Sequence, residues 1–349
     1  MPNESEFRVL SIDGGGIRGL IPATILIELE KLIQTRRGDN MHLGDYFDFI
    51  AGTSTGGILT CLYLTPAIND PKRARFSAED ARKLYLDHGD KIFDRSVWKR
   101  LSSVNGLMDE KYDAAQLEET LKKYFSKLEL SELIRPCLIT GYDVRQYRPI
   151  FFTQQDADDP RSNYLLRDVA RATSAAPTYF EPGMPENLDK IPNATPIVDG
   201  GVFANNPTAC ALVEALGKGR GKFNGVVPLE EIVVLSLGTG GSPATFTFSE
   251  SKDWGLAEWA RPLLGILMEG VSQTVDYQMR SLFKAIGRPD QYLRIDGLFG
   301  DYKNNLDIPG LKSEMDCSSR ENMRRLCQFG EQLALNNSEQ LKGFVERYF

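Results

Sequence analysis

Histidine is the scarcest useful residue in this chain of 349 residues, since it occurs only at His42 and His88. His42 precedes Leu43-Gly44-Asp45, and His88 precedes Gly89-Asp90, which is typical of helix ends and loops rather than of catalytic bases. A nucleophilic serine in this chain is therefore expected to use a base other than histidine.

Cysteine is also sparse, and its pattern argues against both a disulfide framework and a metal site. The five cysteines are odd in number and lack the spacing of metal ligands: Cys61, Cys137, Cys210, Cys317 and Cys327. This pattern fits a reducing compartment. We expect no metal and no metal cofactor.

Long hydrophobic runs and an excess of positive charge are absent from the sequence. No stretch approaches eighteen uninterrupted apolar residues, and residues 1–6 have neither a basic start nor an apolar signal core, so a cytoplasmic location is expected. The net charge of -7 and the pI near 5.2 argue against binding to a nucleic-acid polymer, which needs clustered Lys and Arg.

Apolar strands alternate with helical patterns along most of the chain. This alternation predicts an α/β fold, a three-layer sandwich with a largely parallel central sheet. Strands are expected at 7–12, 46–51, 137–142, 149–153, 196–198, 231–237 and 292–295. Helices are expected at 20–32, 56–64, 78–86, 114–128, 165–174, 207–216, 254–269, 271–285 and from 318 onward. The first of these helices is expected to end near Arg36-Arg37-Gly38, which has the composition of a C-terminal cap.

The sequence contains no internal repeat, low-complexity tract or linker. We therefore expect a single domain over 1–349. Its parts would be a core at about 7–241, a mainly helical insertion at about 67–130 and a helical C-terminal extension at about 245–349.

A serine between two glycines follows the second expected strand. Gly52-Thr53-Ser54-Thr55-Gly56 matches the nucleophile elbow, in which Gly52 and Gly56 would relieve crowding in a strained turn and Ser54 would be held clear of the backbone. Its position between an apolar strand and a helix favours this interpretation over a flexible loop.

A glycine-rich run follows the first expected strand. Gly14, Gly15 and Gly16 offer consecutive backbone amides that can converge on an oxyanion, and Arg18 would steady the loop or attract an anionic group. The same run fits a dinucleotide-binding fingerprint. That fingerprint requires a second strand ending in an acidic residue about twenty residues on, whereas a helix is expected there.

A carboxylate is the best available base for Ser54. Asp199 ends the apolar stretch 196–198 and precedes Gly200-Gly201, which permits close backbone approach. A plain Asp-Gly turn is the alternative interpretation. The shortage of histidine favours Asp199 as a base, and partial burial would have to raise its proton affinity.

The three motifs together resemble the patatin-like phospholipases, whose pattern combines an Asp-Gly-Gly-Gly-x-Arg-Gly loop, a Gly-x-Ser-x-Gly elbow and a later Asp-Gly-Gly. All three occur here in order, at 13–19, 52–56 and 199–201, and residues 172–180 and 236–240 also look typical of that family. The resemblance spans about residues 7–241. It implies a patatin-like variant of the α/β-hydrolase architecture.

By that resemblance, Ser54 is the nucleophile and Asp199 the base of a Ser-Asp dyad, while Gly14, Gly15, Gly16 and Arg18 form the oxyanion hole. The family implies a metal-independent acyl hydrolase of the phospholipase A1/A2 type that acts on phospholipids or other acyl lipids without a cofactor. Alternatives that stay open are a broad-specificity acylglycerol lipase or esterase and a non-catalytic lipid-binding or storage protein.

Regulation and membrane contact are further expectations. Some bacterial members of the family are defence effectors that act when a cyclic nucleotide binds, so a cyclic-nucleotide activator and a role in antiviral defence are open here, as is the oligomeric state. A peripheral membrane contact is expected near the elbow. The candidates are residues 92–98 and the apolar side chains Trp254, Trp259, Leu263, Leu264 and Ile266, although such a stripe also suits a core.

Overall fold

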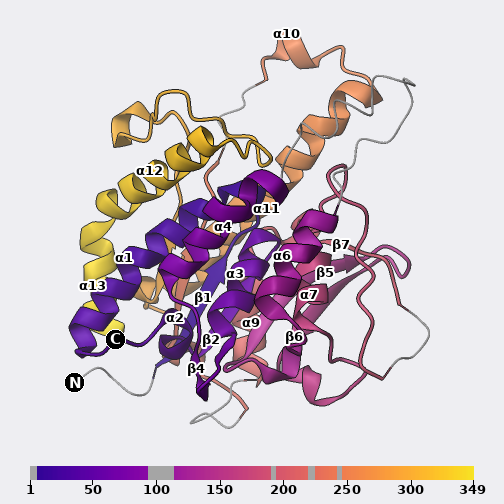
Figure 1. Cartoon of the computed structure of the whole chain (residues 1–349). Helices are drawn as coiled ribbons and strands as arrows, with labels where there is room; N and C mark the ends of the chain where they lie inside the picture. The colour runs from indigo at the N-terminus through magenta and orange to yellow at the C-terminus, as the bar shows by residue number, and fades with distance from the viewer. Residues whose placement is uncertain (1–5, 93–113, 190–193, 219–224, 242–245) are drawn as a thin grey trace.

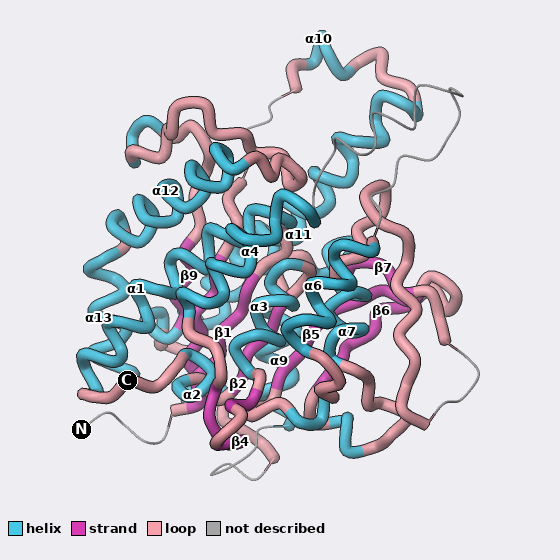
Figure 2. Tube along the Cα trace, viewed as in Figure 1, coloured by secondary structure: helices cyan, strands magenta, loops and turns pink. Residues whose placement is uncertain are grey.

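The computed structural model of the protein describes residues 6–92, 114–189, 194–218, 225–241 and 246–349. Within these residues, seven strands form one central sheet: β1 (Phe7–Ile12), β2 (Phe49–Gly52), β5 (Cys137–Asp143), β6 (Arg148–Thr153), β7 (Ile197–Asp199), β8 (Ile232–Leu237) and β9 (Tyr292–Ile295). The order is β6-β5-β2-β1-β8-β9, and β7 pairs with β5. Helices enclose the strands, as Figures 1 and 2 show.

The sheet is largely parallel, as the sequence predicts. β1 runs parallel to β2 and β8, β2 runs parallel to β5, and β8 runs parallel to β9. Only β6 and β7 among these strands are antiparallel to their neighbour β5. The carboxyl ends of the parallel strands therefore meet at one edge of the sheet, where loops are well placed to carry a site.

Two helical layers cover the two faces of the sheet and complete the predicted sandwich. The core on one face is shared by α1 (Leu20–Arg37), α3 (Thr55–Leu64), α4 (Ala78–Ile92), α6 (Ala115–Phe125), α7 (Leu166–Thr173), α12 (Arg320–Asn336) and α13 (Ser338–Tyr348). The other face packs against α9 (Thr208–Lys218) and α11 (Leu256–Ala285). Neighbouring strand residues point to opposite layers: Val9 packs with the second group, and Leu10 with the first.

Helix α1 shows how local sequence sets an element's end. Arg36 and Arg37 lie in its last turn, where cations favour the helix dipole, and Gly38 ends it with a left-handed φ of 69°. The sequence predicts this cap. The helix runs past its last predicted apolar residue, Leu32, to this predicted cap.

The prediction of two helices at 254–269 and 271–285 is wrong, because α11 continues through Gly270. Glycine in a helix costs only about 1 kcal/mol, which burial of one face offsets. That face carries Met268, Val275, Met279 and Phe283, all of them buried.

Three smaller differences concern other element boundaries. The stretch 67–130, predicted to be mainly helical, also contributes to a hairpin of β3 (Pro66–Ala67) and β4 (Asp70–Ala74). The predicted strand at 46–51 begins later, because Tyr46 ends the short helix α2 (Leu43–Tyr46). The predicted final helix is two helices, α12 and α13, with Asn337 between them.

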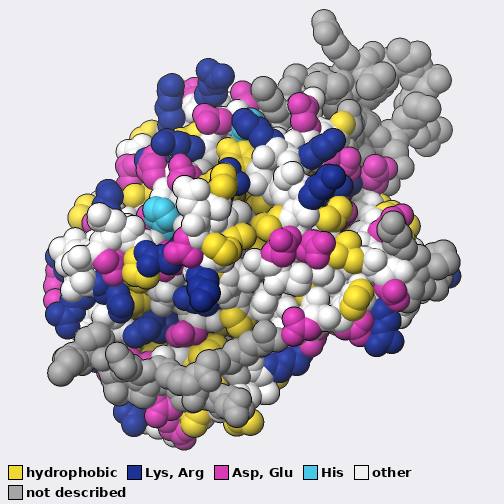
Figure 3. Space-filling view, turned by 60° about the horizontal axis from the view of Figure 1, so that its bottom comes forward, with side chains coloured by type: hydrophobic (Ala, Val, Ile, Leu, Met, Phe, Trp, Pro, Cys, Tyr) yellow, Lys and Arg dark blue, Asp and Glu magenta, His cyan; other side chains and the backbone are white. Residues whose placement is uncertain are grey.

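The surface carries charges of both signs. On the face shown in Figure 3, Lys and Arg side chains are interspersed with Asp and Glu, and hydrophobic side chains lie between them. This face therefore presents no broad field of positive charge of the kind that a nucleic-acid polymer requires.

Candidate active site

Ser54 occupies a strained turn between β2 and α3. Its φ of 56° and ψ of -122° are rare for a residue with a side chain. Gly52 and Gly56 make the turn possible, because a methyl group on either would lie within about 2.2 Å of a backbone carbonyl oxygen. The Ser54 amide donates to Thr173 Oγ1 at 2.9 Å, and the Thr173 hydroxyl donates to the Thr140 carbonyl at 2.7 Å. The elbow is thus braced by the end of α7.

Strand pairing brings Asp199 to the same place. β2 pairs with β5 as far as Gly52 opposite Ile139. Two residues further along β5, Gly141 pairs with Asp199 of β7. Asp199 therefore lies just beyond the carboxyl end of β2, beside the turn that carries Ser54, although the two residues are far apart in the sequence.

Burial shapes the acid–base properties of Asp199, which is only 2% exposed. Loss of hydration raises the pKa of Asp199 to about 6, while the nearby Ser54 hydroxyl and the Gly201 amide act in the opposite direction. The Gly201 amide donates to Oδ1 at 2.7 Å. Oδ2 is buried and makes no hydrogen bond of good geometry within the described part of the chain. The carboxylate is therefore poised to take up a proton near neutral pH.

The glycine-rich loop lies against the elbow, and two of its backbone amides have no acceptor in the part of the chain that the structure describes. The Gly14 amide donates to the Asn205 carbonyl at 3.0 Å. In the described residues, neither the Gly15 amide nor the Gly16 amide has an acceptor. Gly16 has a φ of 58°, and a methyl group there would lie 2.4 Å from the Met315 carbonyl oxygen, so this position requires glycine.

Arg18 braces the loop rather than pointing into the pocket. Its guanidinium donates to the Gly240 carbonyl at 3.0 Å and lies over the ring of Phe299. It is not among the residues that line the pocket at Ser54. These contacts fit the steadying role that the sequence left open for it.

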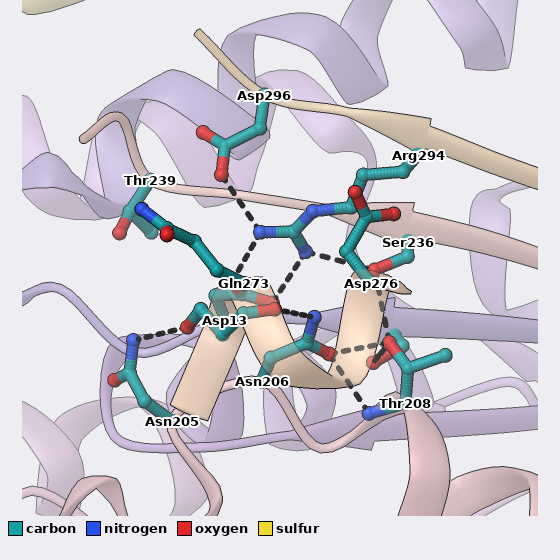
Figure 4. Close-up of polar contacts among 12 residues, drawn as sticks. Asp13, Asn205, Asn206, Thr208, Ser236, Thr239, Gln273, Asp276, Arg294 and Asp296 are labelled. Atoms are coloured by element: carbon teal, nitrogen blue, oxygen red, sulfur yellow. Dashed lines mark hydrogen bonds and ion pairs between the residues drawn. The ribbon is translucent and has the colours of Figure 1, made fainter. Parts of the chain in front are cut away.

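A buried ion pair fixes the start of the same loop, as Figure 4 shows. Nη1 and Nη2 of Arg294 donate to the Asp13 carboxylate, at 2.8 and 2.7 Å, across strand β8. Arg294 also donates to Ser236 Oγ and to Asp296. Burial raises the pKa of Asp13 to about 6 despite the opposing effect of Arg294. Such a bidentate pair fixes orientation as well as distance.

Sequence reasoning missed this role of Arg294, as well as those of Thr173 and Met315. An arginine inside the expected strand 292–295 was a usable signal, because a charge within a buried strand needs a partner. Nothing in the sequence identified Asp13 as that partner. The Ile17 amide donates to the Met315 carbonyl at 2.9 Å, so residues late in the chain also hold the loop.

An apolar pocket of about 640 Å³, including its open mouth, connects these groups. Ser54, Asp199, Gly15 and Gly16 lie on its wall. The rest of the wall is mostly apolar and includes Ile58, Leu117, Pro177, Tyr179, Phe180, Val202, Met268 and Met315. A substrate with a hydrocarbon chain and a polar reacting group suits such a pocket.

Neither histidine lines this pocket. His42 Nδ1 lies 3.6 Å from Glu30 Oε1, and this neighbour raises the pKa of His42. His88 packs edge-on against Tyr124 and lies near Lys123. Asp199 is accordingly the pocket carboxylate placed beside Ser54.

The described residues contain no group of three or more His, Cys, Asp or Glu side chains that could hold a metal ion. Among the same residues, no helix is both long enough and apolar enough to cross a bilayer.

A family model and several similar proteins point to the same family for this chain. A family model described as "Patatin-like phospholipase" matches residues 10–212. Patatin-like protein 1 of Oryza sativa subsp. indica is 33% identical, covering 97% of this chain and 84% of the relative, and Patatin-like protein 1 of Arabidopsis thaliana is 34% identical, covering 95% and 82%. A Solanum tuberosum protein named "Probable inactive patatin-3-Kuras 1" is 33% identical, covering 93% and 85%.

Proposed function

The chain belongs to the patatin-like phospholipase family, and from this premise we propose that it hydrolyses fatty-acyl esters of membrane phospholipids with Ser54 as nucleophile and Asp199 as base. One observation carries the proposal: a serine in a strained turn lies beside a buried carboxylate at the wall of an apolar pocket. The same arrangement disfavours a non-catalytic binding protein, because binding alone gives no reason to keep Ser54 in strain.

The first chemical step is attack of Ser54 Oγ on the acyl carbonyl carbon. Asp199 takes the hydroxyl proton as the new carbon–oxygen bond forms, and then gives it to the departing alcohol as the ester bond breaks. Water attacks the resulting acyl-serine in the second step, with Asp199 again as base. The fatty acid leaves, and Ser54 regains its proton.

The negative oxygen that forms in each step needs hydrogen-bond donors. We assign this role to the Gly15 and Gly16 amides, which have no other acceptor in the described residues. Gly14 and Arg18 then serve to hold the loop, since the Gly14 amide and the Arg18 guanidinium already bind carbonyl groups. Such donors contribute about 10²-fold or more to kcat when they are aligned in advance.

Contact with the bilayer is assigned to the first half of α11, which projects from the body together with α10 (Phe248–Ser251) in Figures 1 and 2. Trp259, Leu263, Ile266 and Leu267 are 38–48% exposed and lie on one helix face. The next residue, Met268, lines the pocket. Residues 93–98 and the side chain of Leu264, also expected at the membrane, lie outside the described residues. A cytoplasmic location with peripheral membrane contact is part of this proposal.

The test is mass spectrometry of the products from phospholipid vesicles, from triacylglycerol emulsions and from a soluble short-chain ester. We expect release of fatty acid and lysophospholipid, with less release from triacylglycerol; the lysophospholipid isomer identifies the acyl position. A preference for triacylglycerol would instead favour an acylglycerol lipase.

Replacing both Leu263 and Ile266 with glutamine is expected to lower the hydrolysis of vesicle phospholipids while leaving the hydrolysis of the short-chain ester unchanged. The same reactions with and without cyclic nucleotides test whether a cyclic nucleotide activates hydrolysis.

Activity is expected to depend on pH through Asp199. The base must be ionised, and burial raises the pKa of Asp199 to about 6. Activity should therefore reach its plateau above about pH 7 and fall roughly tenfold for each pH unit below the midpoint. The measurement is kcat/KM for a soluble ester between pH 4.5 and 9. A midpoint near 4, as for an exposed carboxylate, would contradict the role assigned to the buried Asp199.

A further inference from the structure

Two buried oxygen atoms beside the catalytic pair make no hydrogen bond of good geometry within the described residues. One is Asp199 Oδ2, and the other is Oδ1 of Asn205, whose side chain is 6% exposed. A buried amide oxygen without a donor is costly, by about 1–3 kcal/mol. An orphaned acceptor near a carboxylate is also electrostatically unfavourable, because both groups carry negative charge on oxygen.

The two side chains converge on the same glycine. A methyl group built on Gly201 would lie 3.1 Å from Asp199 Oδ1 and 3.3 Å from Asn205 Oδ1. A methyl group built on Gly14 would lie 2.4 Å from Asn205 Oδ1 and 3.3 Å from Ser54 Cβ. The side-chain amide of Asn205 therefore lies between the glycine-rich loop and the turn that carries Asp199, close to Ser54.

The other end of the Asn205 amide contacts Ser272, whose hydroxyl can form a hydrogen bond with either orientation of the amide. Asn205 Nδ2 donates to Ser272 Oγ at 3.1 Å. A hydroxyl both donates and accepts, and the two ends of a side-chain amide have the same shape. Turning the amide by 180° lets the Ser272 hydroxyl donate to Oδ1. The Nδ2 group then replaces the orphaned oxygen near Asp199.

We propose that Asn205 is a positioning residue for Asp199, with its Nδ2 group directed at the carboxylate and its Oδ1 held by Ser272. The inference rests on the proposed function, in which Asp199 is the base. A donor at this place favours the ionised carboxylate and fixes its orientation toward Ser54. It would offset part of the effect of burial and keep the base ionised at neutral pH.

The experiment compares Asn205→Ala with Asn206→Ala by measuring kcat/KM for a soluble short-chain ester against pH. Asn206 is the matched control, because it is a neighbouring buried asparagine whose amide bonds Thr208 and the Ser272 carbonyl instead. We expect Asn205→Ala to move the midpoint upward by about one pH unit or more. Its plateau at high pH should be retained. The Asn206→Ala midpoint should match that of the wild type.

A second variant and a second readout separate this role from a structural one. Asn205→Asp keeps the shape of the side chain but removes the amide donor, so it should also raise the midpoint of the pH profile. This variant tests the proposal even if Asn205→Ala does not fold. The rate of covalent labelling of Ser54 by a fluorophosphonate should shift with pH in the same way. Unchanged midpoints in folded Asn205 variants would overturn the inference. Wild-type protein that neither hydrolyses esters nor is labelled would instead overturn the proposed function.

Discussion

Replacing Ser54 with alanine is expected to lower kcat by about 10⁴-fold or more, since no other group can form the acyl intermediate. The fold should survive, because the change removes only the hydroxyl and the amide of residue 54 still donates to Thr173. The measurement is fatty-acid release from phospholipid vesicles, together with the thermal unfolding midpoint of the same preparation. Retained hydrolysis in Ser54→Ala would remove Ser54 from the mechanism.

Ser54→Gly is the matched control for the strain in the elbow. Alanine keeps the unfavourable φ of 56°, whereas glycine adopts it freely. Both variants should be inactive, but Ser54→Gly should be more stable to unfolding than Ser54→Ala by about 1 kcal/mol, after allowance for the greater freedom of its unfolded chain. Equal stabilities would mean that the turn stores no strain.

Local sequence predicted the elements around the site well, because each motif lies where one strand ends. The strand at 7–12 and the cap at Gly38 follow from neighbouring residues, and both are confirmed. The predicted helix break at Gly270 is wrong, because contacts outside the local sequence determine the helix there. The buried face of α11 packs against the sheet, and this packing keeps the helix continuous through Gly270. The low helix propensity of glycine describes only a local cost and takes no account of such packing.

Contacts between residues that are far apart in the chain could not be predicted from the sequence. Asp13 and Arg294 are separated by 281 positions, yet they form the buried pair that holds the glycine-rich loop. The side chain of Asn205 reaches the same loop from the turn after Asp199. Tertiary packing creates both contacts, and no spacing in the chain encodes them. The sequence could therefore propose which residues react but not which residues hold them in place.

Replacing Asp199 with asparagine is expected to lower kcat by about 10⁴-fold at pH 8, because the amide cannot take the proton of Ser54. The variant should nevertheless be at least as stable as the wild type at that pH. Burial raises the pKa of Asp199 to about 6, above the value near 4 of an unfolded chain. Folding therefore favours the protonated form, and stability is lost as pH rises from about 4 through 6. Asparagine removes that cost and keeps an oxygen for the Gly201 amide.

Asp143→Asn provides a matched control on the neighbouring strand β5. Asp143 is equally buried, but its Oδ1 accepts from the Arg145 and Gln146 amides, away from the pocket. Its replacement should leave the rate of ester hydrolysis near that of the wild type. If Asp199→Asn kept its activity while His42→Ala or His88→Ala lost it, the proton would have to move by another route. Since neither histidine lines the pocket, such a result would require a different arrangement of the chain around Ser54.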